Sequence, residues 1–165
     1  MRPGPCAFHG PALFPVLAMT LIEQKIKITD LRHLDGLERD AIVLGWEDRR
    51  KPRQRLTTEK GNEIALALPT GTILRQGDIL YMDDHRYVTV EEAEEDVTVI
   101  YPEDMEEGAV IAYELGNRHL PVSIGKENIV TPQNPQMEEF LRKGAIRHLL
   151  RKESFEPTRK GHSHA

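Results

Sequence analysis

Helix signals are confined to two stretches in the second half of this sequence. In the first, Asp104 stands where a helix cap is expected, Glu107 takes the capping-box position, and an apolar run follows at residues 109–115. In the second, Asn134 precedes Pro135, a pair typical of a helix start, and the helix that follows has an apolar face and a glycine stop: Met137, Phe140, Leu141 and Gly144. The remaining patterned segments indicate strands, so the sequence predicts an α+β fold.

Residues 20–90 show the short alternating pattern that is typical of strands. Two such runs, at 53–58 and 63–68, flank residues 59–62, which read as a hairpin loop. Ile64, Leu66 and Leu68 would share one face of the second run. We therefore expect a small all-β domain at residues 19–91 and regard it as a candidate peptide-binding or partner-binding domain.

The spacing of apolar residues changes after an acidic stretch at residues 91–96. A strand at 97–101 leads to the first helix, and two short strands at 121–124 and 128–130 precede the second helix. The alternation of Ile146, His148 and Leu150 indicates a last strand. The order strand, helix, strand, strand, helix, strand predicts a ferredoxin-like domain over residues 92–155.

Both ends of the sequence lack periodicity. Residues 1–18 loosely imitate a signal peptide, but four prolines interrupt the apolar part. We expect a disordered extension there, and metal capture by Cys6 and His9 is the alternative. Residues 156–165 are polar and contain His162 and His164, so we expect a flexible tail.

Composition excludes several classes of protein. Cys6 is the single cysteine, so no intramolecular disulfide can form, which fits a reducing cytoplasm. No apolar run is long enough to span a bilayer. The formal net charge of −5 argues against broad nucleic-acid binding.

One basic cluster stands out against this acidic background: Arg49, Arg50, Lys51, Arg53 and Arg55. The favoured interpretation is a solvated loop and strand edge. A docking surface for an acidic protein partner is the second interpretation. Nucleic acid comes third, because few aromatic residues interleave with the basic ones.

The first helix is followed by a histidine. Ile111, Ala112 and Leu115 form an apolar stripe, and His119 lies one turn further on. Gly116 and Asn117 are residues that tolerate the left-handed conformation in which helices commonly end. From spacing alone, His119 is either a metal ligand or a histidine that meets the helix dipole.

A longer motif contains this histidine: residues 112–121 read Ala-Tyr-Glu-Leu-Gly-Asn-Arg-His-Leu-Pro. Residues 55–61 and 74–80 and the late Phe-Glu-Pro at 155–157 add weaker matches. Together they resemble the UreE-type urease accessory proteins, which are nickel metallochaperones, over residues 19–164. The resemblance implies a cytoplasmic homodimer with His119 at the dimer interface. It also implies that the protein works with urease apoprotein and accessory proteins including a GTPase.

Nickel binding by one imidazole would be weak, and imidazole suits nickel, copper and zinc alike. A two-fold axis would double His119, because every residue at such an interface occurs twice. The stripe at 111–115 would then be interface, although part of it is expected to be core. His162 and His164 would complete the ligand set, and zinc or copper could replace nickel in vitro.

No motif in the sequence predicts catalysis, so we expect a protein that is not an enzyme and has no catalytic residues. His33, His85 and His148 are interpreted as surface or structural residues, and Arg118 as a brace that pairs with Glu114 or a carbonyl. Two alternatives remain open: a protein-binding chaperone module with incidental metal binding, and a metal-dependent hydrolase.

Overall fold

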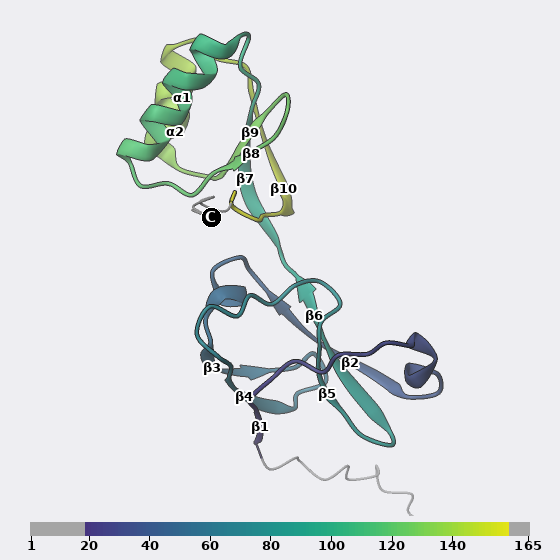
Figure 1. Ribbon diagram of the computed structural model, residues 1–165. Coiled ribbons are helices and arrows are strands. Elements are labelled where there is room, and N and C mark those ends of the chain that lie inside the picture. The colour runs from purple at the N-terminus through teal and green to yellow at the C-terminus, as the bar shows by residue number, and fades with distance from the viewer. Residues whose placement is uncertain (1–18, 159–165) are drawn as a thin grey trace, which may run out of the picture.

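The computed structural model describes residues 19–158 (Figure 1). The expectations for residues 1–18, including Cys6 and His9, and for His162 and His164 lie outside this range. The described chain is α+β, with ten strands, two α-helices and two short 3-10 helices. This confirms the predicted fold class.

The N-terminal unit consists of two three-stranded sheets around one core. The first sheet has the order β1 (Thr20–Ile22), β4 (Glu63–Ala67), β3 (Arg53–Thr57), and the second has the order β2 (Glu38–Leu44), β6 (Arg86–Glu92), β5 (Ile79–Met82). The 3-10 helices are η1 (Leu31–Leu34) and η2 (Asp48–Arg50). Ile64, Leu66 and Leu68 all point into the core, as the predicted β3–β4 hairpin requires.

The C-terminal unit follows the predicted order of elements, namely β7 (Glu94–Ile100), α1 (Met105–Asn117), β8 (Ser123–Ile124), β9 (Ile129–Pro132), α2 (Pro135–Lys143) and β10 (His148–Ser154). Its sheet has the order β10-β7-β9-β8, with all neighbours antiparallel. Both helices lie on the same side of this sheet (Figure 1). Ile111, Leu115, Met137 and Leu141 pack there against strand residues.

Both predicted helix starts are confirmed. The Asp104 side chain accepts a hydrogen bond from Glu107 N, and the Asn134 side chain accepts from the amides of Gln136 and Met137. These bonds satisfy backbone donors that the first turn of a helix leaves unpaired. Each helix therefore begins where its local sequence indicates.

The acidic stretch at 91–96 is strand, which the sequence did not indicate. β6 ends at Glu92 and β7 begins at Glu94, so Ala93 alone separates the two strands. The missing apolar pattern has a simple reason: Glu94, Glu95 and Asp96 pair with β10, where neighbouring residues are polar too. Backbone pairing rather than side-chain burial sustains this part of the strand.

The last strand also differs from its prediction. β10 begins at His148, not Ile146, and runs to Ser154. Ile146 is buried by the turn that ends α2, where its amide donates to Leu141 O at 2.9 Å. The predicted last strand is confirmed as β10, although Ile146 precedes it and Leu150 is 51% exposed.

After β10 the chain crosses the sheet face opposite the helices. Phe155 is buried there against Val97 and Val99, with Trp46 of the N-terminal unit packed edge-on at 5.8 Å between ring centroids. Thr158 then reaches the far edge of the sheet, where its amide donates to Val122 O at 2.7 Å. This crossing segment therefore covers a face that the two helices leave open.

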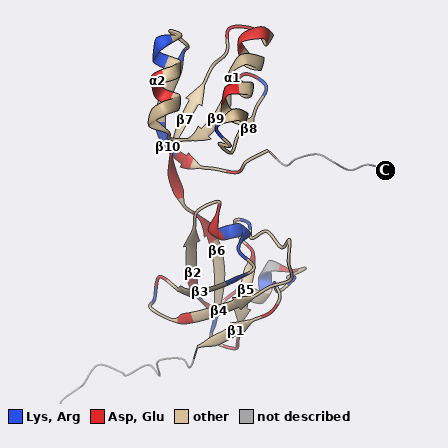
Figure 2. Cartoon of the chain, turned by 90° about the vertical axis from the view of Figure 1, so that its left-hand side faces the viewer, with Lys and Arg blue, Asp and Glu red and all other residues tan. Residues whose placement is uncertain are grey.

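The residues of the basic cluster lie in different environments, some buried and some exposed. The interpretation as a solvated loop is wrong for Arg49. That side chain is 1% exposed and pairs with Glu92 at 2.6 Å. Arg50 pairs with Glu156 at 2.9 Å, and Figure 2 shows the basic η2 beside the acidic end of β6. Arg53 and Arg55 do remain exposed on β3.

Candidate metal centre

His119 occupies the turn that ends α1. The helix continues through Asn117, Arg118 is its cap, and His119 has a φ of 54°. The amide of His119 donates to Gly116 O and that of Leu120 donates to Leu115 O, both at 3.0 Å. This bond pair is the Schellman ending, in which the residue after the cap is left-handed.

The predicted left-handed residues, Gly116 and Asn117, are therefore helical instead. A hydrophobic contact usually accompanies a Schellman ending, and here Leu120 packs against the core that contains Leu115. Burial of Leu120 fixes where the chain turns. His119 then projects into solvent and is exposed, so its imidazole is accessible to a metal ion.

Arg118 braces this turn, as its sequence position indicated. Its guanidinium donates to Glu114 O at 2.9 Å and forms an ion pair with the Glu114 carboxylate. It also lies over the ring of Phe140, 5.6 Å from the centroid. These contacts tie the end of α1 to α2.

The apolar stripe predicted as an interface is mostly core. Ile111 and Leu115 are fully buried, and Ala112 is partly buried. A second stripe spans an arc of about 100° on the helix, at 3.6 residues per turn, and faces outward. Its residues are Met105, Ala109, Ala112, Tyr113 and Gly116.

This outward stripe is unusually apolar for a helix surface. Met105 is 90% exposed and Tyr113 is 67% exposed. A groove of about 650 Å³ lies beside it, bounded by α1 and by the β8–β9 turn with its exposed Ile124. The stripe ends next to His119, so an apolar surface and a free imidazole adjoin.

The other histidines of residues 19–158 are not brought to this site. His33 and His85 belong to the N-terminal unit and are exposed there. His148 Nδ1 lies 2.8 Å from Ile146 O, which gives that ring a structural contact. Within residues 19–158, no three His, Cys, Asp or Glu side chains gather as a metal site would require. Within the described residues His119 is therefore a lone candidate ligand, and His162 and His164 lie outside them.

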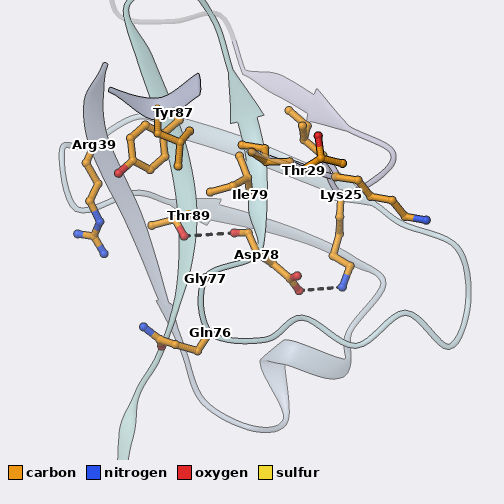
Figure 3. A pocket seen from close by; sticks show the side chains of 13 residues that line it. Lys25, Thr29, Arg39, Gln76, Gly77, Asp78, Ile79, Tyr87 and Thr89 are labelled. Carbon is orange, nitrogen blue, oxygen red and sulfur yellow. Dashed lines mark hydrogen bonds and ion pairs between the residues drawn. The ribbon is translucent and has the colours of Figure 1, made fainter. Parts of the chain in front are cut away.

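Another cavity lies in the N-terminal unit and has a volume of about 730 Å³ (Figure 3). Lys25 bonds Asp78 at 2.8 Å on one side, while Ile79 and Tyr87 supply apolar lining. Its lining contains neither histidine nor cysteine.

Comparison with known families gives a match in each unit. A profile described as the UreE urease accessory protein, N-terminal domain, matches residues 22–93. The corresponding C-terminal domain profile matches residues 95–165. The chain belongs to the UreE family of urease accessory proteins. The second match includes His119, His162 and His164.

Relatives named urease accessory protein UreE are similar over much of the chain. The protein of Synechococcus sp. is 35% identical over 143 residues, which cover 83% of this chain and 96% of that protein. The protein of Bacillus sp. is 36% identical over 129 residues, or 76% and 86%. For the protein of Paraburkholderia xenovorans, 39% identity over 102 residues covers 62% of this chain but 45% of the relative.

Among the described residues of this UreE-family chain, no helix is long and apolar enough to cross a membrane.

Proposed function

We propose that this protein is a nickel-binding homodimer that delivers nickel during assembly of the urease metallocentre. The observation that best supports this proposal is the position of His119, an exposed imidazole at the end of an exposed apolar helix stripe. Family membership supports the urease context. The protein would act by reversible coordination and would catalyse no reaction.

The outward stripe supports the dimer. Met105 and Tyr113 are exposed apolar residues. Covering them with a second copy would remove their apolar surface from water, which lowers the free energy of the dimer. A two-fold axis near the end of α1 would bring His119 close to its symmetry mate. Two imidazoles would then share one nickel ion, with zinc or copper as possible substitutes in vitro.

The crossing segment supports a contribution from the tail. Thr158 is fixed beside Val122, which follows His119 by three residues. His162 follows Thr158 by four residues, a length that spans at most about 14 Å when extended. The tail is therefore long enough for His162 and His164 to approach His119 and complete the ligand set.

We further propose that the chain has two domains, at 19–91 and 92–155, of which the second is ferredoxin-like. The order β10-β7-β9-β8 with both helices on one face supports that assignment. A cytoplasmic location is consistent with the single cysteine. Urease apoprotein and accessory proteins, including a GTPase, would be the partners.

The second candidate function is protein binding by the N-terminal unit with incidental metal binding. The cavity lined by Ile79 and Tyr87 is the observation in its favour. A metal-dependent hydrolase has less support, because no group of three or more His, Cys, Asp or Glu side chains forms a metal site within the described chain.

Calorimetric titration with nickel, together with the molar mass in solution, tests the proposal. The wild-type dimer should bind one tight nickel ion per pair of protomers, or about half an ion per protomer. His119→Ala should remove this site, because one substitution removes two ligands. His148→Ala is the matched control and should retain it. Unchanged tight binding by His119→Ala would contradict the central-site proposal.

A further inference from the structure

The strand β3 forms one edge of the first sheet. The sheet order is β1-β4-β3, so β3 pairs with β4 alone. Leu68 N donates to Pro52 O, and Thr58 N donates to Asn62 O. Hydrogen-bonded and non-hydrogen-bonded pairs alternate along an antiparallel ladder. The even-numbered residues of β3 therefore direct their backbone N–H and C=O groups toward β4.

The odd-numbered positions therefore direct their backbone groups away from β4. Arg53, Arg55 and Thr57 stand opposite Ala67, Ala65 and Glu63 as the non-hydrogen-bonded pairs of this ladder. No backbone bond joins these three residues to another segment of residues 19–158. Their amides and carbonyls form a row of unpaired groups, which is a template for another strand.

The side chains of these positions give the edge a chemical character. Arg53 and Arg55 are exposed, and neither is paired with a carboxylate within the described chain, in contrast to Arg49 and Arg50. Their cross-strand neighbours on the same face are Ala67 and Ala65, which are short and neutral. Both guanidinium groups are therefore free to meet an incoming partner.

We propose that the free edge of β3 is a docking site for an extended acidic segment of a partner protein, which adds a fourth strand to the first sheet. Backbone bonds to residues 53, 55 and 57 would hold the segment. Carboxylates at alternate positions would lie opposite Arg53 and Arg55, where directly opposed opposite charges stabilise a sheet. The carboxylate of Glu63, beside Thr57, favours a neutral residue at the third position.

Two other occupants fit this edge less well. Residues 1–18 contain no Asp or Glu and carry prolines at four positions, which remove ladder donors. A second copy of β3 would place arginine opposite arginine, and like charges directly opposite each other destabilise a sheet. The edge is thus protected from self-association and open to an acidic strand. This site is independent of nickel binding.

Nuclear magnetic resonance titration of the full chain with a defined probe tests the proposal. The probe is the peptide Thr-Val-Glu-Val-Glu-Val-Thr, and a peptide with Gln in place of Glu is its control. The acidic peptide should shift and protect the amides of Arg53, Arg55 and Thr57. The neutral peptide should bind about tenfold more weakly, because two charge pairs are lost.

Three variants separate charge from backbone pairing. The double variant Arg53→Glu/Arg55→Glu should weaken binding of the acidic peptide by at least about tenfold. Thr57→Pro should weaken it comparably, because proline removes an outward amide while both arginines remain. Arg75→Glu, at another exposed arginine of the same unit, should leave binding unchanged. Circular dichroism would verify that each variant is folded.

Several results would overturn the proposal. One is no binding of the acidic peptide by the wild-type chain at millimolar concentration. A second is an equal loss of binding in Arg75→Glu, which would indicate a diffuse charge effect. A third is amide shifts centred on Ile26 and Ile79, which would place the peptide in the cavity. A fourth is binding only after deletion of residues 1–18, which would assign the edge to that segment.

Discussion

The guanidinium of Arg49 donates a hydrogen bond to the carbonyl oxygen of Phe155 at 2.6 Å, although 106 residues separate them in the sequence. The same guanidinium bonds Glu92 at 2.6 Å and lies 3.1 Å from a Glu156 oxygen. Trp46 packs on the Phe155 ring. Arg49 thereby joins the N-terminal unit to the segment that crosses the C-terminal sheet.

Arg49→Met should lower the free energy of unfolding by about 2 kcal/mol, because it leaves the buried carbonyl oxygen of Phe155 without its charged donor. Urea unfolding followed by fluorescence measures this, and Trp46, the single tryptophan, reports on the contact itself. Arg53→Met, on the exposed edge, is the control and should change stability by less than about 0.5 kcal/mol. Equal effects of the two substitutions would contradict the assigned role of Arg49.

Glycine at the two left-handed helix endings should stabilise the fold. His119 has φ 54° and Ala145 has φ 53°, a conformation that costs side-chain-bearing residues energy and glycine little. His119→Gly and Ala145→Gly should each raise the free energy of unfolding by about 0.5 to 1 kcal/mol. Nickel titration should distinguish them, since only His119→Gly should lose the tight site. Destabilisation by both would refute the backbone argument.

Asp40 should contribute stability that depends on pH. Burial tends to raise its pKa, but hydrogen bonds outweigh this effect and hold the pKa below its ordinary value; the donors are the side chains of Thr58 and Asn62 and the amides of Ala41 and Lys60. A lowered folded-state pKa means that the stabilisation is complete above the unfolded-state pKa, about 3.9, and is lost as pH falls through the folded-state value.

Asp40→Asn should therefore destabilise the protein at pH 7 and flatten the loss of stability below about pH 4. Urea unfolding at a series of pH values from neutral to acidic would measure both effects. The exposed Asp84 provides a control, and Asp84→Asn should keep the wild-type slope. A wild-type slope in Asp40→Asn would show that other carboxyl groups dominate.

Charge on the outward stripe of α1 should dissociate the dimer. Tyr113→Glu would place a carboxylate where a second copy is proposed to pack, and burying it unpaired is costly. Light scattering after size exclusion should show half the wild-type mass. Leu149→Glu, on exposed β10, should retain the dimer. A dimeric Tyr113→Glu protein would place the interface elsewhere.

Deletion of residues 161–165 should reduce nickel uptake but preserve the dimer and the central site. The deletion removes His162 and His164, which are two of the three proposed ligands per protomer. The truncated protein should still bind about half a nickel ion per protomer by calorimetry. His162→Ala/His164→Ala in the full-length chain should behave in the same way. Complete loss of binding would argue against a central site at His119.

Several elements could be predicted because their signals are local. The caps Asp104 and Asn134 bond to amides within the next three residues, so each helix start depends on adjacent sequence. The alternation of Ile64 and Leu66 likewise required only the β3–β4 hairpin. The motif around His119 identified the candidate ligand in the same local way.

The backbone at His119 could not be predicted in this way. Gly116 has the stronger intrinsic preference for a left-handed turn, yet α1 continues because Leu120 must reach the core beside Leu115. The sequence alone thus determined the ligand candidate, and packing of Leu120 decided that its side chain faces solvent.

The arginines of residues 49–55 show the same division. Their sequence determined a local excess of positive charge, and nothing in it distinguishes Arg49 from Arg53. Only the tertiary structure brings Phe155 and Glu156 to Arg49 and leaves Arg53 on an open sheet edge. The physical reason is that burial and ion pairing depend on segments over 100 residues apart, whereas capping and alternation act over a few residues.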